Sequence, residues 1–230
     1  MKKRKFALSL TREEMLYGWV YFAVELLLLP SLIYGAAEFL WIRSEAVLNF
    51  IYYLCNFSFC LWIFRPLLRQ SLTRAGQHPG TLVGTVLAGF VLYFCSNYLL
   101  NAGISSCFPD FFNVNDSTIA GMYSDHPFLI ALGVVVLAPV AEECLFRGLL
   151  FVPVVRKNRT AAFVLSTLAF CAIHVAGYVG LYPAATLAVC FLQYIPAGLC
   201  LCWACYRSGS LFAPILIHAA INLVSVLSLG

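Results

Sequence analysis

The feature that most constrains this chain is a series of seven apolar segments, each about as long as a membrane-crossing helix. A helix needs about 20 apolar residues to cross the roughly 30 Å hydrocarbon layer of a bilayer. Such segments cover approximately 17–40, 47–64, 81–102, 127–154, 161–180, 184–206 and 209–229. The connections between them are too short for a soluble domain. The sequence therefore predicts an all-α, polytopic transmembrane helix bundle of about seven spans.

The composition excludes the two main alternatives to a membrane protein. Apolar residues make up 62% of the chain and charged residues 10%, whereas a soluble domain has about 45–50% and 25%. A disordered chain would have the opposite bias, with low hydrophobicity and high charge. The sequence also contains no Gly-rich phosphate loop and no pair of CxxC motifs, and its aromatic residues fit lipid-facing positions. We expect membrane lipids as partners and no nucleic acid.

The basic residues predict how the bundle is oriented. Residues 1–16 form a basic tail that we expect to be cytoplasmic or to lie at the membrane interface, and residues 17–230 form a single transmembrane domain. Twelve of the fourteen Lys and Arg residues fall on one side of the predicted bundle: Lys2, Lys3, Arg4, Lys5, Arg12, Arg65, Arg69, Arg74, Arg156, Lys157, Arg159 and Arg207. Basic connections generally remain in the cytoplasm, so we expect a cytoplasmic N-terminus.

Several polar residues lie inside the apolar segments, where each charged group costs about 2.5–3.5 kcal/mol even on the lenient insertion scale. Four of them lie 11 to 15 residues from the nearest basic residue of a connection: Glu142, His174, His218 and Asn222. At 1.5 Å per residue these separations correspond to depths of roughly 17–22 Å. All four can therefore lie in one layer near the middle of the membrane, although they come from three different segments.

The spacing within the segments divides these residues by role. Glu143 and Arg147 are four residues apart with the acid first, the favourable orientation for an ion pair on a helix. His218 and Asn222 have the same spacing and share a face. Consecutive residues of a helix point about 100° apart, so Arg147 neutralises Glu143 and leaves Glu142 without a cation on its own helix. A carboxylate placed in this way is suited to act as a general base.

Three motifs in this order resemble the CPBP (Abi) intramembrane protease family, which is related to the CAAX-processing Ras-converting endopeptidase. They are EECLFR at 142–147, F-x-x-x-H at 170–174 and H-x-x-x-N at 218–222. The resemblance covers a protease-like core at 125–229. Members of the family commonly have an eight-helix core, so it implies seven or eight spans in this chain.

The resemblance also implies a chemistry for the matching positions. Glu142 would activate water with the help of His174, and His218 and Asn222 would stabilise the oxyanion. Glu143 and Arg147 would form a structural ion pair. The expected protein is a glutamate-dependent intramembrane endopeptidase without a cofactor, acting on peptide or lipid-modified protein substrates. It would be a multi-pass protein of a bacterial plasma membrane.

Other functions remain open at this point. Glu142, His174 and His218 could instead bind zinc in an intramembrane metalloprotease, although H-E-x-x-H is absent. The same family resemblance permits a non-catalytic immunity or binding protein of the membrane. A proton-coupled transporter is disfavoured because the sequence shows no repeated halves. Two further acidic residues of the first segment, Glu25 and Glu38, receive no predicted role.

Overall fold

The computed structural model describes residues 6–229, and every named element in this range is a helix. The prediction of an all-α bundle is therefore confirmed. Residues 1–5 of the predicted basic tail, which include Lys2, Lys3, Arg4 and Lys5, lie outside the described residues. Residues 12–16 of that tail are part of the first helix, α1 (Arg12–Leu27). The helix begins there because Thr11 and Glu14 form a capping box, in which each side chain bonds the backbone N–H of the other residue.

Each predicted apolar segment corresponds to helix in the structure. The first is divided into α1 and α2 (Leu29–Leu40), bent by 52°. The next two are α3 (Glu45–Ile63) and α5 (Pro79–Cys107), and the fourth is one continuous helix over Pro127–Val155. The last three contain α10 (Arg159–Ala176), α11 (Ala184–Gln193) with α12 (Ile195–Ser208), and α13 (Phe212–Leu227).

The number of spans is less sharply defined than the fold class. Among the described residues, five helices are long and apolar enough to cross a membrane, and the bent pair α1–α2 makes a sixth if it is one span. The seventh predicted segment, α13, is apolar but has 16 residues. The architecture is thus a polytopic bundle with a span count close to the predicted value.

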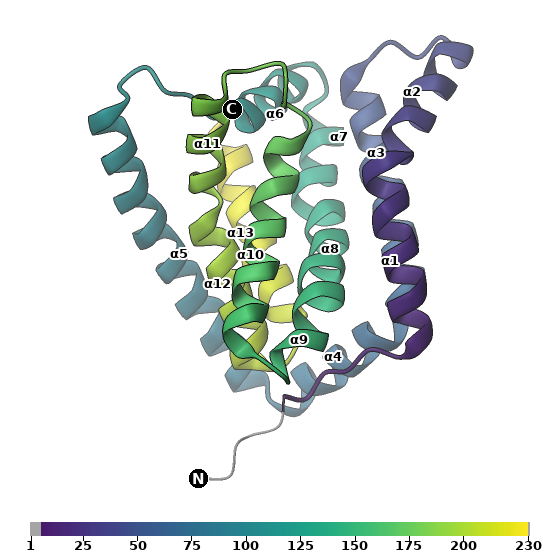
Figure 1. The fold of residues 1–230 in the computed structure, drawn as a ribbon, viewed down its shortest axis with the longest axis vertical. Helices are drawn as coiled ribbons and strands as arrows, with labels where there is room; N and C mark the ends of the chain where they lie inside the picture. The colour runs from purple at the N-terminus through teal and green to yellow at the C-terminus, as the bar shows by residue number, and fades with distance from the viewer. Residues whose placement is uncertain (1–5, 230) are drawn as a thin grey trace.

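Two helices occupy connections in which none was expected. The polar helix α4 (Arg65–Gln77) crosses the lower end of the bundle, and α6 (Val114–Asp125) lies at the upper end (Figure 1). Ser71 fixes α4 against the connection between α12 and α13: its hydroxyl oxygen accepts from Leu211 N at 3.2 Å, and its carbonyl accepts from Ser210 Oγ at 3.0 Å. The side chain of Asn113 caps α6 by accepting two backbone N–H groups.

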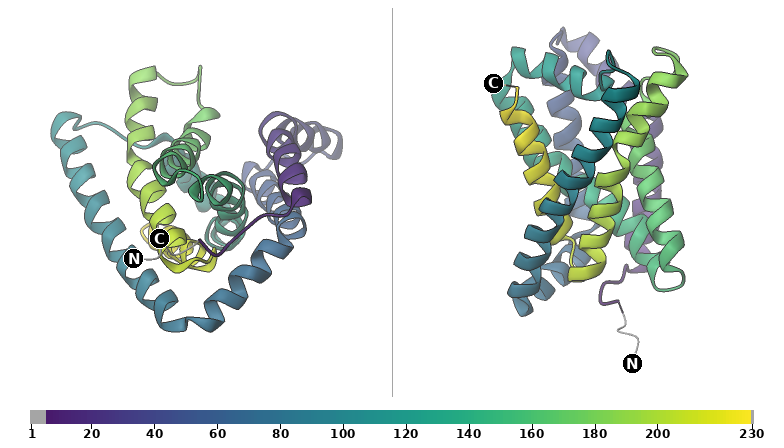
Figure 2. Two further views of the ribbon diagram at one scale, coloured as in Figure 1. Left: turned by 60° about the horizontal axis from the view of Figure 1, so that its bottom comes forward. Right: turned by 90° about the vertical axis from the view of Figure 1, so that its left-hand side faces the viewer.

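The helices form an open arrangement around a central group. In Figure 2 (left), α5 forms one edge and α1, α2 and α3 form the other, with the remaining long helices between them. α1 begins at the lower end and α13 ends at the upper end (Figure 1). The start of α1, the helix α4 and the turn after α9 (Val152–Val155) carry basic residues and lie at the lower end. The structure therefore gathers these basic residues at one end of the bundle, whereas its orientation in a membrane stays a prediction.

Candidate active site

The long helix that carries both consecutive glutamates is not a regular α-helix. After α7 (Pro127–Leu132) it contains the π-helical segment η1 (Gly133–Leu137), then α8 (Ala138–Glu142), a second π-helical segment η2 (Glu143–Phe151) and α9. Pro139 has no N–H to bond the carbonyl of Val135, which accounts for the irregular turn before α8. π-Helical segments inside α-helices are frequent at functional sites. Glu142 and Glu143 lie at the junction of α8 and η2.

Glu143 and Arg147 form an ion pair that is fully buried. Arg147 Nη1 donates to Glu143 Oε1 at 2.9 Å, and both side chains have 0% exposure. Arg147 Nη2 donates to the carbonyl of Gly198 on α12 at 3.0 Å, and the guanidinium lies 4.6 Å from the centroid of the Phe170 ring. The side chain of Arg147 thus links η2, α10 and α12. These contacts are those of a structural ion pair.

Glu142 faces two histidines from two other helices. Its Oε2 lies 3.9 Å from Nε2 of His174 on α10 and 3.9 Å from Nε2 of His218 on α13. The same oxygen is buried and has no hydrogen-bond partner among the described residues. A distance of 3.9 Å is too long for a direct hydrogen bond but suits a small molecule that bonds both groups. The structure therefore brings Glu142, His174 and His218 together, as the sequence predicts.

The hydrogen bonds of the histidines define which nitrogen faces Glu142. Nδ1 of His174 lies 2.7 Å from the carbonyl oxygen of Phe170, which can only accept. Nδ1 of His218 lies 3.0 Å from Oε1 of Glu143, the oxygen that also accepts from Arg147. Both Nδ1 atoms therefore carry a proton. In the neutral form of each ring, Nε2 then presents its lone pair toward Glu142.

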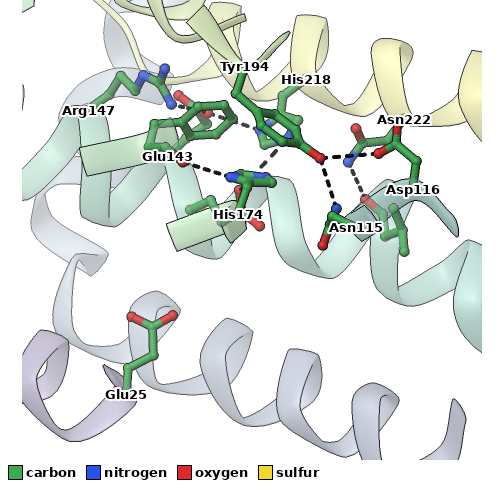
Figure 3. Close-up of polar contacts among 12 residues, drawn as sticks. Glu25, Asn115, Asp116, Glu143, Arg147, His174, Tyr194, His218 and Asn222 are labelled. Atoms are coloured by element: carbon green, nitrogen blue, oxygen red, sulfur yellow. Dashed lines mark hydrogen bonds and ion pairs between the residues drawn. The ribbon is translucent and has the colours of Figure 1, made fainter. Parts of the chain in front are cut away.

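Asn222 lies one turn beyond His218 on α13 and reaches the same cavity. Its Nδ2 donates to the carbonyl of Val134 in η1 at 2.8 Å. An amide nitrogen carries two protons, so one N–H remains available to an occupant of the cavity. The cavity has a volume of about 600 Å³ and is lined by all four predicted catalytic residues. Figure 3 shows His174 on one helix, and His218 and Asn222 on another.

The sequence did not indicate Tyr194, which lies in the break between α11 and α12. Its ring stacks on His174 with centroids 4.2 Å apart and planes inclined by 29°. Its hydroxyl lies 3.2 Å from Oδ1 of Asp116 and accepts from Nδ2 of Asn115 at 3.1 Å (Figure 3). The upper helix α6 therefore contacts the hydroxyl of Tyr194, and the ring of Tyr194 packs against His174. The sequence offered one signal for Tyr194, a tyrosine close to the helix-breaking Pro196. A buried tyrosine hydroxyl usually has a polar partner.

The same geometry bears on the zinc alternative. In the part of the chain that the structure describes, no group of three His, Cys, Asp or Glu side chains converges closely enough to hold an ion. In the zinc alternative the ligands are Glu142, His174 and His218, and Oε2 of Glu142 lies 3.9 Å from Nε2 of each histidine. They would have to move closer together to share a metal.

Part of the chain is similar to a known protein family. Residues 124–224 match the family model described as "Type II CAAX prenyl endopeptidase Rce1-like". This segment contains all six predicted site residues and confirms the resemblance that their motifs carry. No curated protein and no solved structure matches the chain. The apolar helices describe a multi-pass membrane protein, and residues 124–224 are similar to the family of type II CAAX prenyl endopeptidases.

Proposed function

With residues 124–224 matching the family model of type II CAAX prenyl endopeptidases, we propose that this protein hydrolyses peptide bonds with a water molecule activated by Glu142. The observation that carries the proposal is the position of Glu142 Oε2. It is buried, lacks a partner among the described residues, and lies 3.9 Å from Nε2 of two histidines. A water in this space donates one hydrogen to Glu142 and the other to His174.

These positions support the following reaction. Glu142 takes a proton from water as the oxygen forms a bond to the peptide carbon, and the carbonyl oxygen becomes an oxyanion. His218, held through Nδ1 by Glu143, and the free N–H of Asn222 are the two groups that stabilise the oxyanion. Each such donor contributes roughly 3–4 kcal/mol in comparable hydrolases. The C–N bond then breaks and Glu142 returns its proton to the leaving amine, giving a carboxylic acid and an amine; transfer of the acid's remaining proton to the amine leaves a carboxylate and an ammonium.

Glu143 and Arg147 act on the chemistry through His218. Arg147 neutralises Glu143 and fixes its carboxylate, and Glu143 holds the ring of His218 with Nε2 toward Glu142. Neither residue touches the reacting atoms in this scheme. Both are therefore positioning residues, and their loss would disturb stability as well as turnover.

The substrate in this proposal is a membrane-associated or lipid-anchored peptide. The cavity is formed by helices of the membrane bundle, so a peptide held at the membrane reaches it without leaving the bilayer region. We place the basic lower end in the cytoplasm, following the positive-inside rule, and the protein in a bacterial plasma membrane. Lipids are the other expected partner, and no cofactor enters the reaction.

The test is cleavage of quenched-fluorescent peptides, with and without a lipid anchor, by the full chain in liposomes. We expect Glu142→Gln to lower kcat by roughly 10²–10⁴-fold, the usual contribution of a general base. Glu38→Gln is the matched control, because Glu38 is exposed on α2 and is not among the cavity residues. A well-folded Glu142→Gln protein that cleaves at the parent rate would refute the assignment. Peptide binding without cleavage by the parent would favour a non-catalytic binding protein.

A further inference from the structure

Glu25 on α1 is a buried carboxylate that the reaction above does not use. Its side chain points toward the group of residues that contains both histidines and Tyr194, and it comes from a separate helix (Figure 3). It lines the same cavity as Glu142. Glu25 is 6% exposed. The hydroxyl of Tyr52 on α3 donates to Oε1 at 3.2 Å. This bond orients the carboxylate and leaves Oε2 buried, without a hydrogen-bond partner among the described residues.

The other buried glutamates show what a structural carboxylate has in this protein. Glu14 accepts backbone N–H groups from Thr11 and Leu67, each at 2.8 Å, and Glu143 is paired with Arg147. Glu25 has no comparable cation or pair of donors in residues 6–229. A carboxylate within a membrane bundle is costly unless it is partnered. We therefore expect the partner of Glu25 to be a group of the molecule that binds in the cavity.

The cavity wall defines the chemistry of that partner. Three buried side-chain atoms of the lining residues lack a hydrogen-bond partner in the described chain, and all are oxygen acceptors: Glu25 Oε2, Asn49 Oδ1 and Glu142 Oε2. Two more carboxylates, Glu45 and Asp116, also line the cavity, and the lining includes no Lys or Arg among the described residues. A group that complements this wall carries positive charge and several N–H donors.

We propose that Glu25 binds a cationic group of the substrate, an ammonium or guanidinium, and thereby selects peptides with a positive charge close to the bond that is cut. This inference rests on the proposed function, because it places the selected charge in the same cavity as the hydrolytic residues. The cation is either a Lys or Arg side chain or the free α-amino group of a short peptide. Tyr52 and Asn49 of α3 form the same site, Tyr52 by orienting Glu25 and Asn49 by accepting a further N–H.

The test uses one lipid-anchored, quenched-fluorescent peptide in which a single position near the scissile bond is Lys, Arg, norleucine or Gln. Each peptide is made with a free and with an acetylated N-terminus. A hydrogen bond to a charged group is worth about 1.5–3 kcal/mol, so we expect the parent to prefer a cationic peptide over its neutral analogue by roughly 10- to 100-fold in kcat/KM. A preference that follows the Lys or Arg side chain identifies a side-chain cation, and one that is lost on acetylation identifies the α-amino group.

Glu25→Gln keeps the shape of the side chain and removes its charge. We expect it to reduce the preference for the cationic peptide to about threefold or less, which corresponds to loss of most of the charge-dependent binding energy, with Glu38→Gln retaining the parent preference. An unchanged preference in a folded Glu25→Gln protein would overturn the proposal, as would a parent that cleaves cationic and neutral peptides equally well. Either result leaves the hydrolytic role of Glu142 intact.

A binding measurement separates this inference from the proposed function. Equilibrium binding of the same peptides to Glu142→Gln in liposomes requires no cleavage. Tighter binding of the Lys peptide than of the norleucine peptide, abolished when Glu25→Gln is added, supports the cation site even if no peptide is cleaved by the parent. Equal binding of the two peptides contradicts the cation site, whatever the result of the cleavage assay.

Discussion

Replacement of Arg147 by leucine tests the buried ion pair most directly. The change removes the cation that lies 2.9 Å from Glu143 and leaves that carboxylate with 0% exposure and, among the described residues, no ion-pair partner except the ring of His218. It also removes the donor to the carbonyl of Gly198. Breaking a buried pair by removing one partner costs about 3–5 kcal/mol, because the remaining charge is desolvated and uncompensated.

The expected result is a large loss of thermal stability. For a chain of this size, 1 kcal/mol corresponds to about 2–4 °C in Tm, so the Tm of Arg147→Leu should fall by on the order of 10 °C. The measurement is thermal unfolding of purified protein in detergent micelles, followed by circular dichroism at fixed protein and detergent concentrations. His218→Leu should cost less, since it removes a hydrogen bond to Glu143 but leaves Arg147 in place.

The double variant Arg147→Leu with Glu143→Leu distinguishes lost charge balance from lost packing. Replacing both members of a buried pair by apolar residues is often neutral or stabilising, so we expect the double variant to recover most of the lost Tm. Two outcomes would refute the reasoning. One is equal stability of Arg147→Leu and His218→Leu, and the other is a double variant less stable than Arg147→Leu alone.

Three further predictions concern the surroundings of the site. Tyr194→Phe removes the hydroxyl near Asp116 but keeps the ring on His174, so it should lower kcat about 3- to 10-fold, as expected for one hydrogen bond. Tyr194→Leu also removes the stacking and should lower kcat further. The Tm of each variant is the control for folding. Gly198→Ala should reduce the free energy of unfolding by about 1–3 kcal/mol, because its Cβ would lie 2.6 Å from Cγ2 of Thr167. The control is Gly84→Ala, which has no atom within 4 Å of the added Cβ and should leave Tm unchanged or slightly raised. Protein stripped of metal by a chelator, and checked by elemental analysis, should retain its cleavage activity, whereas loss of activity that is restored by zinc alone would favour the metalloprotease alternative.

Much of the fold could be predicted from local sequence because the hydrocarbon layer of a membrane permits few backbone conformations. Backbone groups in hydrocarbon must be bonded within the segment, so a long apolar run in a polytopic chain becomes a helix. The division of the first segment at Leu28 comes just before Pro30, at the start of α2, and Pro139 accounts for the irregular turn before α8. The π-helical segment η2 could not be predicted from local sequence, because side chains of neighbouring helices bond to its backbone, as Ser166 Oγ does by donating to the carbonyl of Phe146 at 2.8 Å.

The short helix α6 illustrates the limit at the site. Its residues Asn115 and Asp116 looked like parts of an outer connection, yet they reach the hydroxyl of Tyr194, more than seventy residues away in the chain. Nothing in the spacing of either segment predicts that contact. It results from the packing of α6 over the upper end of the bundle.

The sequence by itself determined that the chain is a membrane-embedded helix bundle and that Glu142, His174, His218 and Asn222 can share one depth. It did so because helical rise and hydrocarbon thickness are fixed lengths that convert residue spacing into position. Only the tertiary structure decided which atoms face one another across the cavity, and that Glu25 belongs to its wall. Rotation of each helix about its axis is set by side-chain packing against its neighbours, and that packing joins residues far apart in the chain.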